Sequence, residues 1–194
     1  HLKPADQVWV ARWQTMHRKP APTLAQFKEP DLPIVRKIIL HGIKRLARKQ
    51  IELANDYWKR FRRRYTFSAP QIGEMQRYLA LASAQQDHPQ ALKWLTAVNK
   101  NALNDNVSDT RIRLALKKQN WLAVANFITE LPQKTQNTLK WRYWLARALE
   151  QTGKNAQARQ IYNQLAHERD YYGFLAADRI SVQYKMQHRP ITFT

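Results

Sequence analysis

Apolar residues recur at helical spacing along almost the whole of this chain, and this periodicity limits the fold more than any other feature. Between residues 35 and 46, Val, Ile and Leu occupy positions 35, 38, 39, 43 and 46, which form one face of a helix. The same pattern recurs at 141–149, 158–166 and 172–180. No stretch of four or more residues alternates cleanly enough to indicate a β-strand. The sequence therefore predicts an all-α fold.

Residues that typically begin and end helices separate the periodic segments. Ser68 precedes Gln71 by three residues, with a proline between them, which is the pattern of a capping box. Asn120 is a second candidate N-cap, and Gly153 follows a predicted helix end. Four prolines make residues 19–33 the clearest predicted loop. Helices joined by such short connections are expected to pack as antiparallel pairs.

A weak internal repeat accompanies these helix pairs. Residues 153–165 carry Gly, Ala, Tyr and Leu at the spacing of the second helix of a tetratricopeptide-like unit. Segments that begin at Asp87 and Asn120 resemble earlier copies, at intervals of roughly 30–35 residues. We therefore predict a right-handed superhelix, or solenoid, of antiparallel helix pairs that is tetratricopeptide-like. An irregular helical bundle is the alternative.

The chain is strongly basic. Its 194 residues include 33 Lys and Arg but only 14 Asp and Glu, which gives a formal net charge of +19. A surface of this kind attracts polyanions such as nucleic acid, anionic lipid or acidic glycans. The absence of cysteine excludes disulfides, thiolate nucleophiles and zinc sites built on cysteine. No apolar run approaches the ~20 residues of a membrane-spanning helix.

No pattern of catalytic or metal-binding residues stands out. No two of the six histidines have the i, i+4 spacing with an intervening glutamate that a helical zinc site requires. Two close carboxylate pairs, Glu29 with Asp31 and Glu168 with Asp170, are of the type that serves glycosidases. We interpret both as structural, the second because acidic residues favour a helix N-terminus. The sequence therefore predicts no catalytic residue, no metal and no cofactor.

The densest run of charge and aromatic rings is DYWKRFRRRYTF, at residues 56–67. On a helix, Trp58, Phe61 and Tyr65 share one face, so we expect these rings to pack against neighbouring helices rather than stack on a ligand. The cations are expected to face outward, with like charges paired at i, i+4. A plain solvated face is one interpretation of them, and a ligand-binding surface is the other. The predicted ligand-binding residues are Lys59, Arg60, Arg63 and Arg64.

The last third of the chain carries the most specific pattern. Residues 141–149 read WRYWLARAL, and residues 165–179 read LAHERDYYGFLAADR. These two segments, with Gly153 between them, resemble the helical region of the soluble lytic murein transglycosylases. Residues 114–132 are similar to that family as well, and residues 54–95 more loosely. The resemblance implies the helical superhelix, or U-type domain, that precedes the catalytic domain in this family.

The resemblance also implies a function. Enzymes of this family act in the bacterial periplasm or envelope and cleave the MurNAc–GlcNAc bond of peptidoglycan, leaving a 1,6-anhydromuramoyl end. One catalytic glutamate, in a Glu-Ser motif of a lysozyme-like domain, acts first as acid and then as base. This chain has no counterpart of that motif, so no catalytic residue is carried over, and the chain alone is predicted to be inactive. A basic helical scaffold that holds glycan strands is the implied role.

The expected domain organisation follows from the same resemblance. Residues 1–185 are predicted to form the all-helical superhelical scaffold domain, and residues 186–194 the start of a linker toward a catalytic domain. The expected partners are peptidoglycan glycan strands and the lysozyme-like catalytic domain of the same polypeptide. Other envelope proteins are further candidate partners, whereas nucleic acid is disfavoured.

Two other classes of protein also explain the net charge. A helical-repeat protein that binds nucleic acid would combine basic residues with stacking aromatic rings. However, no triplet of residues repeats at fixed helical positions, as a protein that reads one base per repeat requires. A tetratricopeptide-like interaction module would instead dock acidic peptides in a basic groove.

Overall fold

The computed structural model describes residues 4–186, with side chains from residue 7 onward. Every regular element within this range is helical, which confirms the predicted all-α fold class. The elements, in chain order, are α1 (Pro4–Arg18), α2 (Pro20–Gln26), α3 (Pro33–Ala47), α4 (Ile51–Arg64), α5 (Ala69–Gln85), α6 (Ala91–Thr96), the 3-10 helix η1 (Lys100–Ala102), α7 (Asp105–Lys117), α8 (Trp121–Thr129), α9 (Gln133–Gln136), α10 (Leu139–Gln151), α11 (Asn155–Leu165) and α12 (Tyr171–Ile180).

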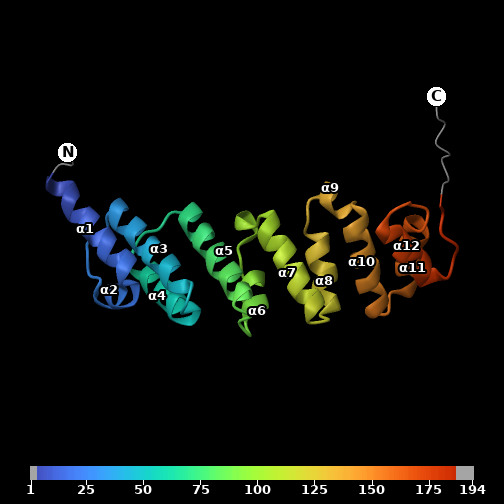
Figure 1. Cartoon of the computed structure of the whole chain (residues 1–194), viewed down its shortest axis with the longest axis horizontal. Helices are drawn as coiled ribbons and strands as arrows, with labels where there is room; N and C mark the ends of the chain where they lie inside the picture. Colours follow the sequence, from blue (N-terminus) through green and yellow to red (C-terminus); the bar gives the residue numbers. More distant parts are fainter. Residues whose placement is uncertain (1–3, 187–194) are drawn as a thin grey trace, which may run out of the picture. The chain divides into compact units, whose positions relative to one another are not determined.

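The chain forms two compact units, His1–Val107 and Ser108–Thr194. Unit 1 contains α1 to α6 and η1, and unit 2 contains most of α7 and all of α8 to α12 (Figure 1). The assignment of residues 1–185 to one scaffold domain followed by a linker stays a prediction. Most of that expected linker, residues 187–194, lies outside the described residues.

The core of unit 1 forms around α3, which packs against α1, α2, α4 and α5. The apolar face expected for α3 is buried, since Val35, Ile38, Ile39 and Ile43 have no exposed area. Their i, i+3, i+4 spacing turns all four toward neighbouring helices. Residues 48–50 connect α3 to α4, and so short a connection makes the two helices antiparallel neighbours.

The core of unit 2 forms where α10, α11 and α12 pack against one another. Ala146 of α10, Ala158 of α11 and Ala176 of α12 are at most 1% exposed, and their small side chains allow the helices to approach closely. Gly173 of α12 marks the tightest approach, because an added Cβ would lie 2.1 Å from the carbonyl oxygen of Glu168. Unit 2 is therefore held together by small residues as well as by aromatic ones.

Local hydrogen bonds define several helix ends as the sequence predicts. Ser68 and Gln71 form a reciprocal capping box at the start of α5, which confirms that prediction. The side chain of Asn120 accepts a hydrogen bond at the start of α8, and Asp170 does the same for α12. Gly153 follows α10 with a φ of 81°, a conformation that favours glycine.

The prediction of a loop over residues 19–33 is wrong in its first half. Residues 20–26 form α2, which begins at Pro20. Proline suits this position because the backbone N–H groups of a first helical turn have no partner within the helix, and Pro22 falls in the same turn. The irregular connection is confined to residues 27–32, which lead into α3.

Candidate ligand-binding groove

Helix α4 carries most of the basic and aromatic run, and the rings of this run face the core of unit 1. Trp58, Phe61 and Tyr65 are between 1% and 4% exposed, which confirms that they pack against neighbouring helices. The Tyr65 hydroxyl also donates a hydrogen bond to the carbonyl of Glu29 at 2.7 Å. Burial raises the pKa of this phenol above its ordinary value. These three rings therefore serve packing, although the edge of Trp58 also contributes to the lining of a groove.

Two of the four predicted ligand-binding cations are tied to α2 and to the segment after it. The Arg60 guanidinium lies 4.8 Å from the ring centroid of Tyr57 and donates to the carbonyl of Leu24 at 2.5 Å. Arg64 reaches the carbonyl of Lys28 at 3.4 Å. Leu24 lies in the last turn of α2, where a cation is favoured, and within the described residues its carbonyl accepts only one backbone hydrogen bond, from the N–H of Phe27 at 3.4 Å. These carbonyls offset the repulsion between the two like charges.

The other two predicted cations, Lys59 and Arg63, are exposed, but only one of them lines a groove. Lys59 pairs with Asp56 at 3.2 Å and lines a groove, whereas Arg63 makes no ion pair within residues 4–186 and does not line that groove. Arg62, which the sequence reasoning did not select, lines the groove beside Lys59. A signal for it existed, because Asn55, Lys59 and Arg62 fall at i, i+4 and i+7 on one helical face.

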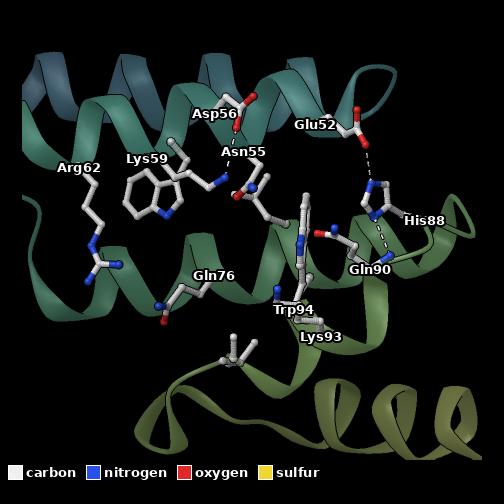
Figure 2. Close-up of a pocket in the computed structure, with 15 residues that line it drawn as sticks. Glu52, Asn55, Asp56, Lys59, Arg62, Gln76, His88, Gln90, Lys93 and Trp94 are labelled. Carbon is white, nitrogen blue, oxygen red and sulfur yellow. Dashed lines mark hydrogen bonds and ion pairs between the residues drawn. The ribbon is translucent and has the colours of Figure 1, made fainter.

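This groove, of about 530 Å³, lies between α4, α5 and α6 of unit 1 (Figure 2). Asn55, Lys59 and Arg62 line it from α4, Gln76 from α5 and Trp94 from α6. Figure 2 shows the Trp94 ring extending from α6 toward α4. Sites for small ligands typically measure roughly 300–1,000 Å³, so this groove has the size of a binding site.

The Trp94 ring is held in place by a histidine. The His88 ring lies 4.9 Å from it, between centroids, and the His88 Nε2 lies 3.0 Å from a carboxylate oxygen of Glu52. The backbone N–H of Gln90 donates to His88 Nδ1 at 3.2 Å. Because Nδ1 accepts this hydrogen bond, the imidazole proton is assigned to Nε2, which donates it to Glu52. These two hydrogen bonds give the His88 ring one orientation, and the ring fixes the side of the groove next to Trp94.

Several polar groups of the groove have no partner within the described part of the chain. The Oε1 atom of Gln76 is buried without a hydrogen bond, and the Asn55 side chain makes none with any residue in the range 7–186. Arg62 and Lys93 likewise form no ion pair there. Buried polar atoms without a partner are uncommon in folded proteins, so the Gln76 Oε1 atom indicates capacity for a ligand. Arg62 and Lys93 are exposed and remain available to an anion.

The carboxylates that the sequence singles out have structural partners. Glu29 pairs with Arg12 at 2.8 Å. Asp31 accepts a hydrogen bond from the backbone N–H of Thr66 at 2.8 Å, and this bond lowers the pKa of Asp31. Asp170 caps α12. These contacts support the structural interpretation of Glu29, Asp31 and Asp170, none of which lines the groove, whereas Glu168 forms no ion pair within the described residues.

Residues 4–186 contain neither a metal site nor a membrane-spanning helix. No group of three or more His, Asp or Glu side chains has a geometry that could hold a metal ion. No helix in that range combines the length and the apolar character needed to cross a bilayer. The groove therefore offers side chains that can bind a ligand, and no metal site accompanies them in the described residues.

The sequence of this chain is similar to part of several known enzymes. No family model matches it. Over 95 residues, 49% of the chain, it is 28% identical to the soluble lytic murein transglycosylase of Escherichia coli K12 and 26% identical to that of Salmonella typhimurium. The aligned segment spans only 15% of the length of these relatives.

Solved structures give fuller coverage. An inactive mutant of the lytic transglycosylase Slt from Pseudomonas aeruginosa is 32% identical, with a TM-score of 0.83 over 98% of this chain and 31% of that one. The 70 kDa soluble lytic transglycosylase from Escherichia coli is 21% identical, with a TM-score of 0.69 over 94% of this chain and 29% of that one. These similarities confirm the resemblance to the soluble lytic murein transglycosylases, and the chain spans about a third of the two enzyme structures or less.

Proposed function

We propose that this chain is a helical, non-catalytic part of a soluble lytic murein transglycosylase, and that it binds or positions peptidoglycan glycan strands. In this proposal the MurNAc–GlcNAc bond is cleaved, with formation of a 1,6-anhydromuramoyl end, by a lysozyme-like domain of the same polypeptide. The enzyme would act in the periplasm. The observation that carries the proposal is the likeness, over 98% of the chain, to one part of a lytic transglycosylase.

The net charge of +19 supports a binding role for the helical part. Peptidoglycan carries carboxylates on its lactyl-peptide stems, so a basic surface attracts it. Each exposed contact of this kind is weak and is screened by salt within roughly 10 Å at 0.1 M ionic strength. Many such contacts together would hold a strand near the protein without fixing its register, which suits a scaffold that presents strands to a catalytic domain.

We assign bond cleavage to the catalytic domain and strand binding to the helical part. The likeness of this chain to only about a third of a lytic transglycosylase supports this assignment. Three of the carboxylates that the sequence singles out, Glu29, Asp31 and Asp170, are held in structural hydrogen bonds or ion pairs.

Retention of the purified 194-residue chain on isolated peptidoglycan sacculi tests this proposal. The fraction retained is measured across a salt series, in parallel with retention on heparin and on tRNA, and an unrelated helical protein of similar net charge serves as the control. We expect the chain to be retained on sacculi more than the control, and its retention to fall as salt rises. Tighter and more salt-resistant retention on tRNA would instead favour a nucleic-acid-binding protein.

The gene gives an independent test. We expect the reading frame to encode, beyond residue 194, a lysozyme-like domain with a Glu-Ser motif. A frame that closes at residue 194 would count against a transglycosylase and favour a free-standing interaction module.

A further inference from the structure

The groove between α4, α5 and α6 brings together an aromatic ring, amides without partners and cations (Figure 2). The geometry points to a subsite for one acidic amino sugar, namely an N-acetylated pyranose that carries a carboxylate. The choice of a sugar as the ligand rests on the proposed function. The residues that would bind it all belong to unit 1. The subsite would give a diffuse basic scaffold one defined place at which a single sugar unit is bound.

Trp94 provides the platform for the sugar ring. Its side chain is only partly buried, and its position is fixed by the His88 ring, which Glu52 and the backbone N–H of Gln90 hold in one orientation. The C–H groups of a pyranose pack on an aromatic face. Because the ring is already held, binding costs little side-chain entropy.

Asn55 and Gln76 provide hydrogen-bonding groups for the substituents of the sugar. A side-chain amide both donates and accepts, and so complements an N-acetyl group or a hydroxyl. Within the described range the Asn55 side chain has no hydrogen bond, and the buried Oε1 of Gln76 has no partner. A donor from a bound sugar would satisfy an acceptor that the chain itself leaves unpaired.

The charges of the groove select an acidic sugar over a phosphate-bearing ligand. Arg62 and Lys59 line the groove from α4 and Lys93 lines it from α6, and neither Arg62 nor Lys93 forms an ion pair in residues 4–186, so a carboxylate finds cations there. Glu52 and Asp56 line the same groove, with side chains that are 79% and 70% exposed. These carboxylates accept hydrogen bonds from sugar hydroxyls but repel the phosphates of a nucleic acid.

Two matched substitutions test this subsite. Arg62→Ala and Arg63→Ala each remove one arginine from α4, but only Arg62 lines the groove. The probes are the GlcNAc–MurNAc disaccharide, with its lactyl carboxylate, and chitobiose, a neutral disaccharide of N-acetylglucosamine. Binding to the full chain is followed by NMR titration, and the indole N–H signal of Trp94 is assigned through its loss in Trp94→Phe.

The acidic disaccharide is expected to shift the Trp94 signal. Arg62→Ala should weaken its binding about tenfold, which is typical of a lost hydrogen bond to a charged group, and Arg63→Ala should leave it unchanged. Neither substitution should alter the weaker binding of chitobiose. Asn55→Ala should weaken both sugars, because an amide contact does not depend on the carboxylate.

Equal effects of Arg62→Ala and Arg63→Ala would overturn the subsite, as would tighter binding of a short single-stranded oligonucleotide or of a free acidic peptide in the groove. Retention on sacculi separates this failure from a failure of the proposed function. A chain that is retained on sacculi but binds no disaccharide overturns the subsite alone. A chain that is not retained at all overturns the proposed function as well.

Discussion

Arg60 is predicted to stabilise α2, although its sequence context marks it as a ligand-binding residue. Its guanidinium stacks on Tyr57 and donates to the carbonyl of Leu24 in the last turn of α2. Arg63, three residues further along the same helix, makes no ion pair within the described residues. Arg60→Ala and Arg63→Ala therefore form a matched pair that removes the same charge from two different environments.

The expected loss for Arg60→Ala follows from these contacts. A hydrogen bond to a charged group contributes about 1.5–3 kcal/mol, and the lower end applies to Arg60 because its side chain is exposed. A cation–π contact at an exposed site adds about 0.5–1 kcal/mol. Removing the repulsion between Arg60 and Arg64 returns about 0.2–0.5 kcal/mol. The net loss is about 2 kcal/mol, whereas Arg63→Ala should change stability by less than about 0.5 kcal/mol.

Two assays check this difference. Urea unfolding followed by circular dichroism should show a midpoint lower by about 1 M for Arg60→Ala and unchanged for Arg63→Ala. Amide hydrogen exchange in residues 20–28 should be at least about tenfold faster in Arg60→Ala, because α2 loses one of its links to α4 and keeps only the weaker bond from Tyr57 to Ala21. Equal midpoints and equal exchange in the two variants would refute the anchoring role of Arg60.

Other predictions concern single positions. Gly173→Ala should lower the free energy of unfolding in urea by about 3 kcal/mol or more, because the new Cβ meets a backbone oxygen at 2.1 Å. Gly153→Ala should lower it by about 1 kcal/mol, because Gly153 has a φ of 81° but no atom within 4 Å of the new Cβ. Ser68→Ala removes half of the capping box of α5 and should cost about 1 kcal/mol in the same assay. Burial raises the pKa of Glu150, but hydrogen bonds, the strongest from Tyr162, lower it below the ordinary value overall. The charged carboxylate therefore stabilises the fold above about pH 4.5, and this contribution is lost as the pH falls through the lowered pKa. Thermal unfolding between pH 3 and pH 7 should consequently depend less on pH in Glu150→Gln than in the native chain, and identical pH profiles would contradict this assignment.

The helices and their buried faces could be predicted because both depend on local spacing. Ile38 and Ile43 were expected on one face of a helix, and both are fully buried in unit 1. Ser68 and Asn120 cap the helices that they precede, because capping involves backbone groups only two or three residues away. The helix at residues 20–26 is not predicted from its sequence because proline is common in loops, although a first helical turn also accepts proline.

The candidate site could be predicted only in part. The basic run pointed to α4, yet of the four selected cations only Lys59 lines the groove. The run does not reveal that Arg60 reaches the backbone of α2, because the two segments are 36 residues apart in sequence. Trp94 was missed because its role depends on the contact with His88, in the connection before α6.

The sequence by itself therefore established an all-helical chain, its strong positive charge and its likeness to one enzyme family. Each of these depends on composition or on residues close together in the chain. Only the tertiary structure shows that the cations of α4 have different roles. Arg60 and Arg64 bind backbone carbonyls of another segment, whereas Lys59 and Arg62 line a groove. The physical reason is that a cation's role depends on which carbonyls, carboxylates and rings lie within a few ångströms, and packing between distant segments decides this.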